Sequence, residues 1–183
     1  MRAFTNILLV FLFTACTSVP DERMTSYVDF PETRELTART LSLDSALFRY
    51  PYRVRVQDDK AVVLDLHGTE YFFHAFHYPG FHYLSSFGKR GDAPEEMLSA
   101  ENLRWNGNFL WTLDSNKSEL TRLGFASSGD SLLRLEAVSL DEELLRALDF
   151  VQYDDSTFII PDYSGDGRFC LVSRQGKLLR KIG

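Results

Sequence analysis

One stretch decides the fold: Val62-Val63-Leu64-Asp65, a short apolar run that ends in an aspartate. The pattern returns as Trp111-Thr112-Leu113-Asp114 and as Ile159-Ile160-Pro161-Asp162, at intervals of 49 and 48 residues. Each copy follows a tight turn rich in Asp or Asn and precedes two further apolar stretches that turn residues separate. Short β-branched and aromatic runs between such turns are typical of strands, so each repeat holds four of them.

Four short antiparallel strands at a period of about 40–50 residues are typical of one blade of a β-propeller. The fold class is therefore all-β, built from β-propeller-type repeats of four-stranded antiparallel blades. A β-sandwich would show turns at similar spacing but no such repeat. The sequence places the last strands at 82–87, 131–136 and 177–182, and the three blades at about 51–92, 100–139 and 147–183.

Three blades make an incomplete ring, because closed propellers have four to eight. We expect residues 34–183 to be a partial β-propeller, as in a truncated gene product or a fragment. The alternative is an open stack of three blades, whose edges would need covering or a partner chain. Residues 34–41 (RELTARTL) alternate as a strand of the kind that completes the last blade of a propeller.

One segment has a helical pattern. Ser139-Leu140-Asp141-Glu142 fits a capping box, and Leu144, Leu145 and Leu148 follow at helical spacing. We therefore expect a helix of one or two turns between the second and third blades.

The N-terminus has the pattern of a secretory signal. Arg2 precedes an apolar run from Ile7 to Phe13, which is much shorter than the roughly 20 residues of a membrane span. Residues 12–16 (LFTAC) resemble a bacterial lipobox, which implies cleavage after residue 15 and diacylation of Cys16. Two acyl chains are enough for stable membrane anchoring.

The lipobox predicts the layout of the rest of the N-terminal region. Residues 1–15 would be the signal peptide, and the polar residues 16–33 would carry the acylated Cys and act as a tether. The protein would then lie in the cell envelope, anchored to the outer membrane on its periplasmic or surface side. An ordinary signal peptide with Cys16 incidental is the alternative. Cys170 would remain as the one free thiol, with a buried structural role.

Charge and motifs exclude several classes of function. The chain has 26 acidic and 20 basic residues, which disfavours nucleic-acid binding because that function normally needs a basic face. The sequence has no phosphate loop, no dinucleotide fingerprint and no G-x-S-x-G turn. We therefore expect no cofactor and favour a non-catalytic function.

Histidines and aspartates are the remaining candidates for a metal site. All four histidines lie between His67 and His82, but His74 and His77 have opposite parity in an alternating strand and should point to opposite faces. Residues 162–167 (DYSGDG) resemble a calcium loop but lack its further oxygen ligands. We expect no metal; the weaker alternative uses His74, His77, Asp162 and Asp166.

The aspartates that end the repeated pattern are Asp65, Asp114 and Asp162. Their position at strand ends predicts that each caps the turn that follows it. A ring of three carboxylates is the alternative.

Residues 86–97 (SFGKRGDAPEEM) form a junction between the first two blades. Gly88 and Gly91 would allow a positive φ there, and Pro94 would start a turn that residues 95–97 continue helically. A backbone anion nest beside Lys89 and Arg90 is the alternative.

This junction resembles that of the TolB-like six-bladed β-propeller lipoproteins of Gram-negative bacteria. Gly88, Gly91, Pro94 and Glu96 match the family pattern, whereas Ala93, Glu95 and Met97 depart from it. The resemblance implies the propeller fold and the envelope location but says little about activity. We expect a domain that binds a protein, a peptide or a glycan. The alternatives are a propeller hydrolase or lyase acting on extracellular carbohydrate or lactone, and a non-functional truncated paralogue.

Overall fold

The computed structural model describes residues 32–183 except 42, 44–45 and 165–166. The chain divides into two units, residues 1–39 and 40–183, and the strands found among the described residues all lie in the second. In the part that the structure describes, no helix is long and apolar enough to cross a membrane. Residues 32–39 of the first unit are exposed and have no regular secondary structure.

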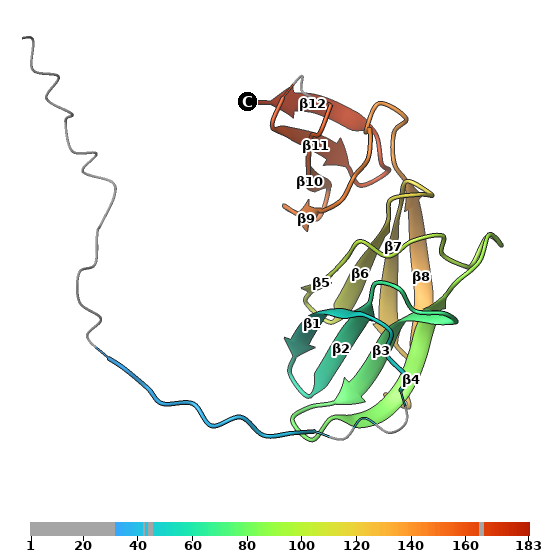
Figure 1. The fold of residues 1–183 in the computed structure, drawn as a ribbon. Helices are drawn as coiled ribbons and strands as arrows, with labels where there is room; N and C mark the ends of the chain where they lie inside the picture. The colour runs from blue at the N-terminus through green and yellow to red at the C-terminus, as the bar shows by residue number, and fades with distance from the viewer. Residues whose placement is uncertain (1–31, 42, 44–45, 165–166) are drawn as a thin grey trace, which may run out of the picture. The chain divides into compact units, whose positions relative to one another are not determined.

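The strands form three four-stranded antiparallel sheets, in each of which neighbours in sequence are neighbours in space (Figure 1). The prediction of all-β, four-stranded antiparallel blades is thereby confirmed. Blade 1 holds β1 (Pro51–Gln57), β2 (Lys60–Asp65), β3 (Tyr71–His77) and β4 (His82–Lys89). Blade 2 holds β5 (Asn102–Asn106), β6 (Phe109–Asp114), β7 (Glu119–Phe125) and β8 (Leu132–Ser139). Blade 3 holds β9 (Val151–Gln152), β10 (Thr157–Pro161), β11 (Phe169–Ser173) and β12 (Leu178–Ile182).

The second strand of blade 1 is buried on both faces, which explains its uninterrupted apolar sequence. Val62 and Leu64 pack in the core between blades 1 and 2, whereas Ala61 and Val63 face the opposite side. Successive side chains of a strand point to opposite faces, so a strand covered on both sides needs apolar residues throughout.

The core between blades 2 and 3 centres on aromatic and aliphatic side chains. The rings of Trp111 and Phe158 meet edge to face with centroids 5.1 Å apart. Cys170 is buried in the same cluster, and burial raises the pKa of its thiol. A protonated, enclosed thiol behaves as a small apolar side chain.

The chain itself covers the outer face of blade 1. Leu43, Ala46 and Phe48 pack on Ala61, Val63 and Phe76, and the Phe48 ring stands edge-on to His74 at 4.9 Å. The segment before β1 therefore removes this apolar face from water.

The corresponding outer face of blade 3 is more open. Strand register places Val151, Ile159 and Leu171 side by side on it, with Phe169 on the same face. Val151 and Phe169 are 47% and 45% exposed.

Three sequence-based expectations are wrong. Residues 34–41 form no strand, and Leu36 is 92% exposed. A strand needs a neighbour to pair its backbone groups, and no strand in the described range pairs with this segment. The alternation of polar and apolar residues in this segment is therefore not enough to form a strand.

The expected helix after Ser139 is replaced by turns. Leu144 N–H donates to Asp141 O at 2.9 Å, and the Asp141 side chain accepts from Glu143 N–H at 3.2 Å. Leu140, Leu144 and Ala147 are buried between blades 2 and 3. The spacing of these apolar residues thus lets an irregular connection pack between the two blades, without forming a helix.

The expected helical continuation after Pro94 is absent as well. Glu96 N–H donates to Ala93 O at 3.0 Å, which closes a single turn. Met97 then pairs with Arg90 in an isolated parallel bridge. Met97 pairs with the end of blade 1 instead of continuing a helix, because this pairing gives hydrogen-bond partners to backbone groups that a short helix would leave unpaired.

Candidate functional site

The repeated aspartates hold the turns that follow them, and Asp65 and Asp114 also hold the segments that enter their blades. Asp65 accepts hydrogen bonds from the backbone N–H groups of Arg49 (2.7 Å) and Tyr50 (2.6 Å) before β1, and of His67 (3.3 Å) after β2. The carboxylate thus ties the chain before the first strand to the end of the second.

Asp114 repeats this arrangement in blade 2. It accepts from Leu98 N–H at 2.7 Å on the entering segment, and from Asn116 and Lys117 N–H, both at 3.0 Å, in the following turn. Asp162 accepts from Ser164 N–H at 2.8 Å, and the bonds from Ser164 lower its pKa. Each aspartate serves its own blade. Across the described residues, no group of three or more His, Cys, Asp or Glu side chains could hold a metal ion.

The histidines are dispersed on blade 1. His74 is 6% exposed; its Nδ1 lies 2.8 Å from Ser86 Oγ, which also bonds the Tyr83 hydroxyl at 2.8 Å. Burial lowers the pKa of His74, which favours the neutral ring. His77 is exposed, pairs across the hairpin with His82, and lies 3.4 Å from Asp59. Cys16 and Asp166 lie outside the described residues.

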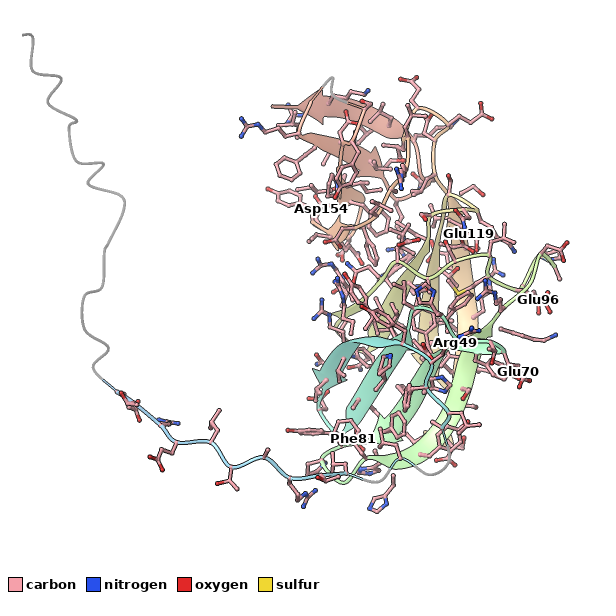
Figure 2. All side chains as sticks on the ribbon, viewed as in Figure 1. Arg49, Glu70, Phe81, Glu96, Glu119 and Asp154 are labelled. Carbon is pink, nitrogen blue, oxygen red and sulfur yellow. The ribbon has the colours of Figure 1, made fainter. Side chains whose placement is uncertain are left out.

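The junction loop, residues 88–97, is held together by hydrogen bonds between its own residues. Gly88 has φ of 64°, and a Cβ there would meet the Phe73 ring at 2.7 Å. Glu96, labelled in Figure 2, accepts from Lys89 Nζ at 2.7 Å and from Ala93 N–H at 3.3 Å. The Lys89 bond is the main reason why the pKa of Glu96 is lowered. A Cβ at Gly91 would overlap the Glu96 carboxylate.

Blade 2 holds the same loop from outside. Lys117 Nζ donates to Ala93 O at 2.6 Å and to Glu96 O at 2.5 Å, and Arg134 donates to Pro94 O at 2.8 Å. Arg90 donates to Gly68 O at 3.2 Å. The positive charges around the loop therefore serve protein carbonyls and carboxylates, which is the arrangement of a structural clip between blades.

Three hollows lie elsewhere, along the turns that follow the first strands of the blades. Three pockets of about 380, 500 and 430 Å³ adjoin there, because neighbouring pockets share lining residues such as Trp111, Phe109 and Trp105. We call the three together the turn-side groove. It is lined mainly by residues 55–60, 104–111 and 150–155, with Arg122, Gly124, Phe125, Leu135 and Arg174 from other strands.

Two arginines stacked on aromatic rings form one wall of the groove. The Arg174 guanidinium lies 4.5 Å from the Trp111 ring centroid, and that of Arg122 lies 4.7 Å from the Phe109 centroid. Both pair with Glu136, Arg174 through contacts of 3.1 and 2.6 Å and Arg122 at 3.1 Å. Stacking and pairing together fix the orientation of these planar groups.

A polar chain joins the three blades beside the groove. Arg53 Nη1 donates to Asn102 Oδ1 at 2.8 Å, and Asn102 Nδ2 donates to Asp149 Oδ1. Asp149 also accepts two bonds of 2.9 Å from Arg104 Nη2. Sequence reasoning missed this chain and the groove, although the alternation in RVRV (53–56) already places Arg53 and Arg55 on one face of β1.

The structure holds three repeated blades that pack on one another, and an aspartate at a strand end holds a turn in each. A junction loop links the first two blades. These features are those expected of one family of propellers. The model of the TolB-like 6-blade propeller-like family matches residues 29–183. The chain belongs to this family. The resemblance to the TolB-like propeller family is thereby confirmed, and the blades are those of a TolB-like propeller domain.

A solved structure shares the fold of this TolB-like domain. It is the crystal structure of a "Putative exported protein" from Bacteroides fragilis, with 14% sequence identity and a TM-score of 0.57. The match covers 75% of this chain and 38% of that protein, so the chain spans well under half of its length. No curated protein matches the sequence.

Proposed function

We propose that this chain is a lipid-anchored protein of the cell envelope whose TolB-like domain binds a ligand in the turn-side groove and catalyses no reaction. The observation that carries the binding part is the groove itself, where three pockets meet beside exposed polar and aromatic side chains. The lipobox-like sequence ending at Cys16 supports the anchor. The solved structure with the same fold carries the description "Putative exported protein", which is consistent with this location.

Unpaired polar atoms support a binding role for the groove. Gln152 Oε1 and Trp105 Nε1 are both buried and have no hydrogen-bond partner among the described residues. An unsatisfied buried polar group costs about 1–3 kcal/mol, so proteins keep few of them. A ligand that offers a hydroxyl to the amide oxygen and an acceptor to the indole N–H would satisfy both.

Among the described residues, the one close serine–histidine contact, between Ser86 and His74, favours a structural role over catalysis. Ser86 is already bonded to Tyr83, and Phe48 covers the His74 ring. Neither Ser86 nor His74 lines the turn-side groove. The alternative is a hydrolase or lyase acting on extracellular carbohydrate or lactone, and the experiment must distinguish it from a non-catalytic binding protein.

The test is ligand binding by the detergent-solubilised full-length chain on panels of glycans and peptides, with product formation followed in the same samples. Phe109 borders two of the pockets and is 39% exposed, so Phe109→Ser should weaken binding at least tenfold without unfolding the protein. Leu133→Ser, an exposed position on β8 outside the groove, is the control and should leave binding unchanged. Equal binding by both variants would overturn the assignment of the ligand to the two pockets that Phe109 borders. Turnover lost in Phe109→Ser would establish the enzyme instead.

A further inference from the structure

Three arginines gather on the first strands of blades 1 and 2, beside the 380 Å³ pocket of the groove. Arg53 and Arg55 lie two residues apart on β1, and Arg104 lies on the neighbouring strand β5. Arg55 and Arg104 line the pocket directly. All three side chains are half-buried, where their charges are less screened than at an open surface.

The positive charge of this cluster is not balanced. Asp149 is bidentate with Arg104. Within the described residues, no carboxylate lies within ion-pair distance of Arg53 or Arg55. Burial and then the charges of Arg53 and Arg104 lower the pKa of Arg55. Asp149 offsets only part of this effect on Arg55. Three arginines therefore face one carboxylate here, in a chain whose net charge is −6.

Arg55 also has hydrogen-bond donors that are not used within the described residues. Its Nε donates to Leu103 O at 3.3 Å, while Nη1 and Nη2 have no acceptor among the residues that the structure describes. A guanidinium presents its N–H groups as a planar fork that fits a carboxylate with two parallel bonds. The unused end of Arg55 has the geometry for such a ligand.

The other walls of the pocket favour a sugar as the carrier of that carboxylate. Trp105 offers a half-buried ring with an unpaired N–H, and Gln152 offers an unpaired amide oxygen. A sugar ring supplies hydroxyls for both atoms and an apolar face for the indole. A pocket volume of 380 Å³ falls within the range of about 300–1,000 Å³ seen for small-ligand sites.

We propose that this pocket binds a uronic acid unit of an acidic glycan, with Arg55 holding the carboxylate and with Trp105 and Gln152 holding the ring. This assignment rests on the proposed function of the groove as a binding site and names its ligand class. Arg53 and Arg104 contribute charge and hold Arg55 in a positive field.

The experiment compares charged and uncharged forms of one glycan. Isothermal titration of the detergent-solubilised full-length chain would use tetrasaccharides of galacturonate and of mannuronate, the methyl esters of both, and tetraglutamate. The free acids should bind at least tenfold more tightly than the esters, and their affinity should fall as salt rises from 50 to 500 mM.

Two matched variants test the role of Arg55. Arg55→Gln should weaken binding of the free acids at least tenfold, whereas Arg180→Gln, which removes an exposed arginine of β12, should not change it. Far-UV circular dichroism and the thermal midpoint of each variant verify that the fold is intact.

The outcomes separate this inference from the proposed function. Equal affinity for acids and esters, unchanged binding by Arg55→Gln, or binding of neither acid would overturn the uronate site. Tetraglutamate binding better than both tetrasaccharides would replace the glycan by an acidic peptide. Binding of an ester or another uncharged probe that is lost in Phe109→Ser would uphold the groove while refuting the acidic ligand.

Discussion

Arg53 donates to Asn102 at 2.8 Å, and this bond joins the first strand of blade 1 to the first strand of blade 2. Asn102 is 1% exposed and uses its amide nitrogen to reach Asp149 at the entrance to blade 3. One buried side chain therefore connects all three blades. In a stack of repeats, stability depends on such interfaces between neighbours as well as on each repeat.

Asn102→Ala should lower the free energy of unfolding by about 1–3 kcal/mol, because Arg53 and Asp149 each lose a buried hydrogen-bond partner. Urea denaturation measures this directly. Asn116→Ala, which alters an exposed turn residue of blade 2, is the control and should change stability by less than about 0.5 kcal/mol. Equal stability of the two variants would show that the polar chain does not join the blades energetically.

The sequence allowed the blades to be predicted but not this polar chain. Strand alternation and the repeated aspartates are local signals, and Asp65 and Asp114 occupy matching places because each repeat builds the same turn. Arg53 and Asn102 are 49 residues apart, and nothing in the periodicity of either strand indicates that their side chains meet. The same holds for a groove assembled from turns of three blades.

The helix expected after Ser139 is absent because contacts between residues far apart in the sequence determine the local structure there as well. The leucines after Ser139 have helical spacing, yet burial of Leu140 and Leu144 against blade 3 determines the path of the chain. Tertiary packing overrides local propensity where a short segment makes few backbone bonds of its own.

His74 should make stability depend on pH. Burial lowers its pKa below the unfolded value of about 6.5, so the unfolded chain takes up a proton at a higher pH than the folded protein. This contribution to stability is complete above that unfolded pKa and is lost progressively as the pH falls toward the folded pKa.

Urea denaturation at pH 7.5 and 5.5 measures the effect. The wild type should lose more stability between these values than His74→Gln, which cannot take up the proton. His82→Gln, an exposed position, should behave as the wild type. A wild-type pH response that persists in His74→Gln would mean that another group is responsible.

Cys16→Ser should release the protein from membranes, because the thiol that carries the acyl chains is absent. Ultracentrifugal fractionation and labelling with palmitate measure the two consequences together. Ser18→Ala lies just beyond the lipobox-like stretch and should remain labelled and membrane-bound. An ordinary signal peptide predicts the opposite: no label in the wild type and the same fractionation for Cys16→Ser.

Gly88 and Gly107 separate two effects that a glycine can have. Both have positive φ, 64° and 54°, but a Cβ at Gly107 would meet nothing within 4 Å, whereas one at Gly88 would meet the Phe73 ring at 2.7 Å. Alanine in the left-handed region costs roughly 1–2 kcal/mol, so Gly107→Ala should lower stability by about that amount. Gly88→Ala adds the overpacking of Phe73, roughly 1–3 kcal/mol more. Urea denaturation compares the two; a smaller loss for Gly88→Ala would mean that the junction loop moves away from blade 1 without resistance, and that its clip to Glu96 and Lys117 is not rigid.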